Sequence, residues 1–194
     1  MSSSFEKALE AVSIAEGGSS NRASDSGGET YRGVARNFHP TWPGWHIVDQ
    51  CRSFEGFPAV LDTVAELRPM VVQFYKEEFW DTWNGDAIAS ISFAVANEIF
   101  ESGVNVGYGK SARWFQRACN LLNYGQNLFP DLVVDGALGG KSRAALQVLT
   151  ERGEDTDVVK LLNLFQGRHY ITLTERKKSQ EDFIRGWVRQ RVVV

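Results

Sequence analysis

The chain has 194 residues, 43% of them hydrophobic, and a formal net charge of −3. This length is enough for one good core, with at most a small appended subdomain. The acidic balance argues against nucleic acid as the main partner, because phosphate binding is led by basic side chains.

The first predicted elements are one helix and a small β arm. Apolar residues at helical spacing predict an amphipathic helix over residues 4–16. Gly18 and its glycine neighbour end this helix. Residues 19–37 are polar and glycine-rich, and residues 29–34 fit a short strand or hairpin arm. We expect the glycines of these turns, Gly18 among them, to need positive φ.

The pattern then becomes helical. Residues 38–57 are rich in Pro, Gly and Trp, which predicts an irregular loop. Apolar stripes predict one helix over residues 60–67, ended near Pro69, and a second over residues 71–80. Residues 88–100 are nearly all apolar or small, so we expect the central buried helix there.

The C-terminal part is predicted to be helical as well. Glycines at 103–109 break the central helix. Further helices are expected over residues 114–122, 141–152, 155–169 and 180–191, with a loop at 123–140. The order of elements predicts a mainly α (α+β) fold, in which helices surround a central buried helix and a small β arm lies near the active site.

The most informative polar residues lie in the first predicted turn. Glu16 stands at the end of the predicted helix, and Asp25 and Thr30 follow in the glycine-rich arm. Cleavage of a glycosidic bond needs a proton donor and a second group on the other face of the sugar. The helix dipole raises the pKa of an acid in the last turn, which suits a general acid. Spacing alone leaves open a solvent-facing Glu16, a turn-forming Asp25 and a strand-forming Thr30.

Other features point away from metal, cofactor and membrane. Cys51 and Cys119 lack metal-site spacing and are interpreted as free thiols, with one bridge left open. The three histidines are scattered, so we expect no metal and no cofactor. Residues 1–10 have an early acid and no apolar run, so we expect a chain made in the cytoplasm without a signal peptide. No window is apolar enough for a membrane span. The six tryptophans favour core packing over a groove that stacks on sugars.

Motifs along nearly the whole chain resemble one family. Residues 5–33 carry a helix, then Glu16-Gly17-Gly18 and Asp25-x-Gly27-Gly28-x-Thr30-x-x-Gly33. This pattern resembles the N-terminal motif of glycoside hydrolase family 108, whose members are lysozyme-like N-acetylmuramidases, many of them phage endolysins. Segments that resemble the family or its companion predicted peptidoglycan-binding region follow in order at Phe74–Trp80, Glu101–Gly107, Gln116–Ala118, Val134–Gly139 and Ser179–Trp187.

The resemblance implies roles for particular residues. It implies a lysozyme-like fold with Glu16 as the catalytic acid, and with Asp25 and Thr30 managing the attacking water. It implies a catalytic region over residues 1–110 and a helical peptidoglycan-binding-like region over 111–194. Because the apolar stripes of the C-terminal helices are too few for an independent core, we expect both regions to pack together as one cooperative unit. Substrate contacts are expected at Tyr31, Arg32, Asn105 and Gln116.

The implied activity is hydrolysis of the β-1,4 bond between N-acetylmuramic acid and N-acetylglucosamine in peptidoglycan. We expect a monomeric phage or prophage endolysin that binds glycan strands, does not insert into membranes, and reaches the wall through a holin. Two alternatives stay open. A lytic transglycosylase would use Glu16 alone as acid and then base, so that Asp25 would matter little. A non-catalytic wall-binding or secretion-associated protein would keep the fold without turnover.

Overall fold

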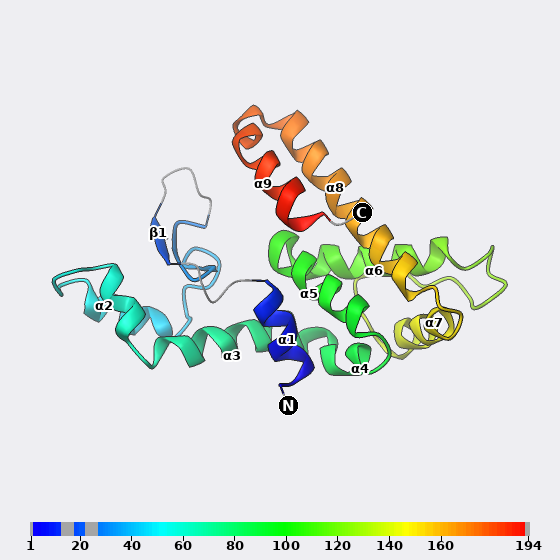
Figure 1. The fold of residues 1–194 in the computed structure, drawn as a ribbon, viewed down its shortest axis with the longest axis horizontal. Helices are drawn as coiled ribbons and strands as arrows, with labels where there is room; N and C mark the ends of the chain where they lie inside the picture. The colour runs from blue at the N-terminus through cyan, green and yellow to red at the C-terminus, as the bar shows by residue number, and fades with distance from the viewer. Residues whose placement is uncertain (1, 13–17, 22–26, 193–194) are drawn as a thin grey trace. The chain divides into compact units, whose positions relative to one another are not determined.

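The protein is mainly helical and forms two compact units. The computed structural model describes residues 2–12, 18–21 and 27–192, and the chain divides into residues 1–80 and 81–194 (Figure 1). The predicted fold class, mainly α with a small β arm, is confirmed. The predicted division near residue 110 stays a prediction.

The first unit combines helices with one small sheet. Its elements are α1 (Ser4–Ala11), β1 (Ser19–Asn21), β2 (Glu29–Tyr31), β3 (Val34–Ala35), α2 (Gly44–Cys51), the 3₁₀-helix η2 (Ala59–Thr63) and α3 (Leu67–Phe79). The three strands form an antiparallel sheet in the order β1-β2-β3. A capping box of Ser3 and Glu6 begins α1. The Phe5 ring of α1 lies 5.8 Å from that of Trp80, which packs α1 on the end of α3.

Of the two β-arm glycines Gly18 and Gly28, only Gly28 stands where the backbone requires glycine. Gly28 has φ +67°, and a Cβ there would lie 2.8 Å from the Asn37 amide nitrogen, so this position requires glycine. The expectation for Gly18 is wrong, because its φ lies outside the left-handed region and no atom of the described residues lies within 4 Å of a Cβ placed there. The helix before it is described as far as Ala11 and its C-cap Val12.

Two predictions in the first unit were wrong because proline was taken as a helix breaker. Residues 44–51, predicted to be loop, form α2 directly after Pro43, with Trp45 and Val48 buried. Pro69 does not end a helix but lies in the first turn of α3. The first backbone N–H groups of a helix have no partner within the helix, so proline fits there without losing a hydrogen bond.

The second unit is a bundle built on α5. Its elements are η3 (Asp81–Trp83), α4 (Gly85–Ala89), α5 (Phe93–Val106), α6 (Tyr108–Leu121), α7 (Gly140–Glu151), α8 (Asp155–Arg176), η4 (Lys178–Gln180) and α9 (Glu181–Arg191). Both α6 and α8 pack on α5, and α8 also contacts α6 (Figure 1). Their shared core is apolar and fully buried at Val95, Ile99, Phe100, Phe115 and Leu162.

The central helix is shifted from its predicted place. The predicted helix over residues 88–100 is divided into α4 and α5, because Ser92 has extended backbone and caps α5. The Ser92 Oγ accepts from the Val95 N–H at 3.4 Å and donates to Asp155 at 2.8 Å. Gly103, predicted to break the helix, is buried within it, and α5 ends only at Gly107 with φ +89°.

Burial explains the cysteines and most of the tryptophans. Cys51 and Cys119 are free and buried, which confirms their interpretation as thiols, and burial raises the pKa of Cys119 to about 12. Five tryptophans are core residues: Trp42, Trp45, Trp80, Trp83 and Trp114. Among the described residues, no helix has the length and apolar character needed to cross a membrane.

Candidate functional site

The predicted catalytic residues fall around the β arm in sequence. Glu16 and Asp25 lie outside the described residues, Glu16 between α1 and β1 in the sequence and Asp25 between β1 and β2. Thr30 is the central residue of β2, pairs with Ser20 in β1, and donates its hydroxyl to the Gly28 carbonyl at 3.3 Å. The catalytic assignment of all three stays a prediction.

The next two predicted residues connect the arm to the helices of the first unit. The Tyr31 side chain is 2% exposed, and its hydroxyl donates to the Leu61 carbonyl at 3.4 Å. The Arg32 guanidinium donates to the Tyr31 hydroxyl at 3.3 Å and to Asp62 at 2.7 Å. From α3, the Tyr75 hydroxyl donates to the Arg32 carbonyl at 3.2 Å. These contacts fix the end of β2, and substrate binding by Tyr31 and Arg32 stays a prediction.

A network of ion pairs holds the other side of the arm. The Glu29 carboxylate of β2 pairs with Arg36 at 2.8 Å and with Arg52 at 2.6 Å. Asp49 of α2 pairs with the same two arginines, at 2.7 and 3.0 Å. The Arg36 guanidinium also lies 4.2 Å from the centre of the Trp45 ring. Since each charge has two opposite partners, the network fixes the sheet on α2.

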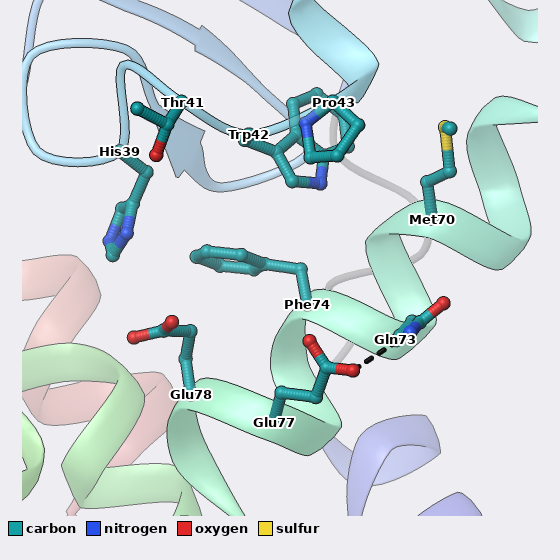
Figure 2. A pocket seen from close by; sticks show the side chains of 9 residues that line it. All are labelled: His39, Thr41, Trp42, Pro43, Met70, Gln73, Phe74, Glu77 and Glu78. Carbon is teal, nitrogen blue, oxygen red and sulfur yellow. Dashed lines mark hydrogen bonds between the residues drawn. The ribbon is translucent and has the colours of Figure 1, made fainter.

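A pocket of about 260 Å³ opens beside this arm within the first unit (Figure 2). One face of α3 forms one wall and the segment 39–43 forms the other. The lining residues are His39, Thr41, Trp42, Pro43, Met70, Gln73, Phe74, Glu77 and Glu78. On α3 they recur at spacings of three and four, which places them along one side of the helix.

The pocket combines aromatic rings with carboxylates. The His39 and Phe74 rings form a T-shaped contact, with their centroids 4.6 Å apart. The Gln73 amide donates to Glu77 at 2.7 Å. Figure 2 shows His39 and Glu78 on the same side of the Phe74 ring, from opposite walls. Such a pocket offers apolar surface for a sugar ring and acceptors for its hydroxyl groups.

Sequence reasoning missed this pocket. Glu77 and Glu78 lie inside the aromatic segment Phe74–Trp80 that was noted only for its resemblance, and His39 was treated as a scattered histidine. The signal that was available is the recurrence of all the α3 lining residues, apolar and polar, at i, i+3, i+4, i+7 and i+8 from Met70.

The remaining predicted substrate contacts belong to the second unit. Gln116 of α6 is 1% exposed, and its amide donates to Asp135 at 2.8 Å and to the Ala137 carbonyl at 3.1 Å. Its oxygen accepts from the Gly136 N–H at 2.8 Å. The amide therefore holds the loop before α7. Asn105 is half-buried on α5, and substrate binding by either residue stays a prediction.

Further hydrogen bonds to Asp135 and Gly136 hold the same loop. The Asp135 carboxylate also accepts from the Ala137 N–H at 2.8 Å, and the bond from Gln116 lowers the pKa of Asp135. The Tyr108 hydroxyl donates to the Gly136 carbonyl at 3.0 Å. The Val-Asp-Gly motif thus has a structural reason: Asp closes the turn and Gly supplies its φ of +86°.

Two comparisons give matches that span the chain. The profile of the family described as Glycosyl hydrolase 108 matches residues 9–107, and the profile described as Predicted Peptidoglycan domain matches residues 110–192. No curated protein matches the chain. A solved structure, described as that of Brucella abortus SagA, is similar with a TM-score of 0.54 and 17% identity, over 93% of this chain and 95% of that one. At this identity the likeness concerns the fold.

Proposed function

This chain belongs to the glycosyl hydrolase 108 family, and we propose that it cleaves the β-1,4 bond between N-acetylmuramic acid and N-acetylglucosamine. It is a glycoside hydrolase that acts on peptidoglycan. The observation that carries the finer proposal is the family match over residues 9–107, which contains the motif from Glu16 to Gly33.

We assign Glu16 as the general acid that protonates the leaving oxygen. Asp25 then orients or activates the attacking water, and the Thr30 hydroxyl helps to hold it. The position of Thr30 in the middle strand of the arm supports this role. Ion pairs from Glu29 to Arg36 and Arg52 fix that strand on α2. A fixed strand is a suitable support for a group that positions water.

The pocket beside the arm is our candidate for a sugar subsite in the same unit. Phe74 and Trp42 provide aromatic surface, and Glu78 and His39 provide hydrogen-bonding groups on one side of it. Its volume of about 260 Å³ suits one small ring better than a long segment of glycan.

Product analysis tests the proposed bond. Purified peptidoglycan is digested with the full chain, and the new ends are identified by mass spectrometry. Reducing N-acetylmuramic acid ends support the muramidase, and Asp25→Asn should then lower the rate strongly. Predominant 1,6-anhydro ends, with Asp25→Asn still active, would assign a lytic transglycosylase instead. Binding to peptidoglycan with no new ends would make the chain a wall-binding protein.

We also propose that the protein serves as a phage or prophage endolysin. Expression of the full chain in a bacterial host, alone and with a holin, tests this role. Lysis that starts only when the holin is induced supports it. Intact cells under both conditions, with peptidoglycan cleavage in the lysate, would contradict the endolysin role and leave the enzymatic activity in place.

A further inference from the structure

A cationic groove lies between α6 and α8 in the second unit. Its volume is about 420 Å³, and its lining residues are Lys110, Trp114, Arg117, Phe165, Arg168, His169 and Thr172. The α6 residues recur at i, i+4 and i+7, and the α8 residues recur at the same kind of spacing, so each helix contributes one face. The groove is therefore built by two packed helices and not by a loop.

In the described part of the chain, the cations of the groove have no acidic partner. The α6 sequence from Tyr108 to Leu121 contains no Asp or Glu. Within the part of the chain that the structure describes, Lys110, Arg117 and Arg168 form no ion pair. Elsewhere cations do pair: Lys160, exposed on the same helix α8, lies 3.1 Å from Asp157. The groove thus concentrates positive charge that no described carboxylate neutralises through an ion pair.

Two cations of the groove contact ring side chains in its wall. The Lys110 ammonium lies 3.4 Å from the His169 ring nitrogen, and the Arg117 guanidinium lies 4.5 Å from the centre of the Phe165 ring. The Trp114 ring stacks with Phe165 at 6.4 Å. Burial, and then the charge of Lys110, lower the pKa of His169. An anion bound in the groove would be attracted by the three cations that line it.

We propose that this groove binds the free carboxylates of peptidoglycan stem peptides. The inference rests on the proposed function in one respect, that peptidoglycan is the substrate. Guanidinium groups match carboxylates in a planar two-bond geometry, and the rings below them provide apolar surface for the peptide.

Calorimetric titration with a defined probe tests the inference. The probe is the synthetic tripeptide L-alanyl-γ-D-glutamyl-meso-diaminopimelate, and its fully amidated form is the matched ligand. We expect the full chain to bind the free acid, and 0.5 M salt to weaken the binding. Arg117→Gln and Arg168→Gln should each weaken it about tenfold, since a charge-assisted pair is lost. Arg168→Lys, which keeps the charge, should retain more affinity than Arg168→Gln.

Lys160→Gln is the control, because it removes an exposed cation of α8 outside the groove. Equal affinity for the acid and the amide would overturn the inference, as would Lys160→Gln weakening binding as much as Arg168→Gln. Binding of a glycerol-phosphate polymer with no binding of the tripeptide would assign the groove to a phosphate ligand and overturn it too. The titration needs no turnover, so a chain that fails to cleave peptidoglycan can still bind the probe.

Discussion

Glu98 is a buried carboxyl whose removal should stabilise the protein at neutral and alkaline pH. It lies on α5 with 7% of its surface exposed, and its Oε1 has no hydrogen-bond partner among the described residues. The pKa of Glu98 is raised from 4.5 to about 7, first by burial and then by the nearby charge of Glu101, while a hydrogen bond with Asn163 lowers it in part.

The sign of the pH dependence follows from this direction. Because the folded pKa of Glu98 lies above the unfolded value, the folded state holds the proton longer than the unfolded state does between about pH 4.5 and 7. The free energy of unfolding therefore falls as pH rises through this window. At 1.36 kcal/mol for each pKa unit, the loss amounts to about 3 kcal/mol as an upper limit. The loss of stability is nearly complete by about pH 8, one unit above the folded pKa.

Glu98→Gln removes the titration while it keeps the shape and the acceptor for Asn163. Urea unfolding of the wild type and of this variant at pH 4.5, 6 and 8 measures the difference. We expect similar stability at pH 4.5 and a variant more stable by up to about 3 kcal/mol at pH 8. Glu151→Gln, on the exposed surface of α7, controls for the substitution. A difference between Glu98→Gln and wild type that does not change with pH would refute the reasoning.

Two further predictions concern the second unit. Gly136→Ala should lower the melting temperature more than Gly153→Ala: both have positive φ, but only at Gly136 would the new Cβ meet a backbone atom, the Gly109 carbonyl oxygen at 3.2 Å. Equal shifts in a thermal scan would show that this contact has no cost. Truncation after residue 110 should give insoluble or unfolded protein, because it removes α6 and α8 from α5, and a soluble, active 1–110 fragment would contradict this. The side chains uncovered by the truncation include Val95, Ile99 and Phe100.

The sequence predicted most helices of the second unit, because apolar stripes there recur at helical spacing. It failed at Pro43 and Pro69, where proline occupies a helix start, and at Ser92, where a capping serine divides an apolar run. These failures share one cause. The prediction relied on which residue types are present. A helix start depends instead on which backbone N–H groups have no partner within the helix, and there proline costs nothing and serine can accept a hydrogen bond.

The site was predicted less completely than the fold. Residue type and spacing proposed Thr30, and the family resemblance proposed Gln116, as site residues. Neither indicated that the loop at Asp135 engages the Gln116 amide. The pocket at Glu78 and the groove at Arg117 join segments far apart in the sequence, at 39–43 with α3 and at α6 with α8. Such pairings depend on tertiary packing, and no single sequence pattern records them.

The central claim is that Glu16 is the general acid of a peptidoglycan hydrolase. The most direct measurement is the rate at which Glu16→Gln releases new reducing ends from purified peptidoglycan, compared with wild type at equal folded concentration. The variant keeps the size of the side chain and loses the transferable proton. We predict an unchanged melting temperature and a rate at least about 10²-fold lower, the usual scale for loss of a general acid. A rate close to that of the wild type would contradict the claim.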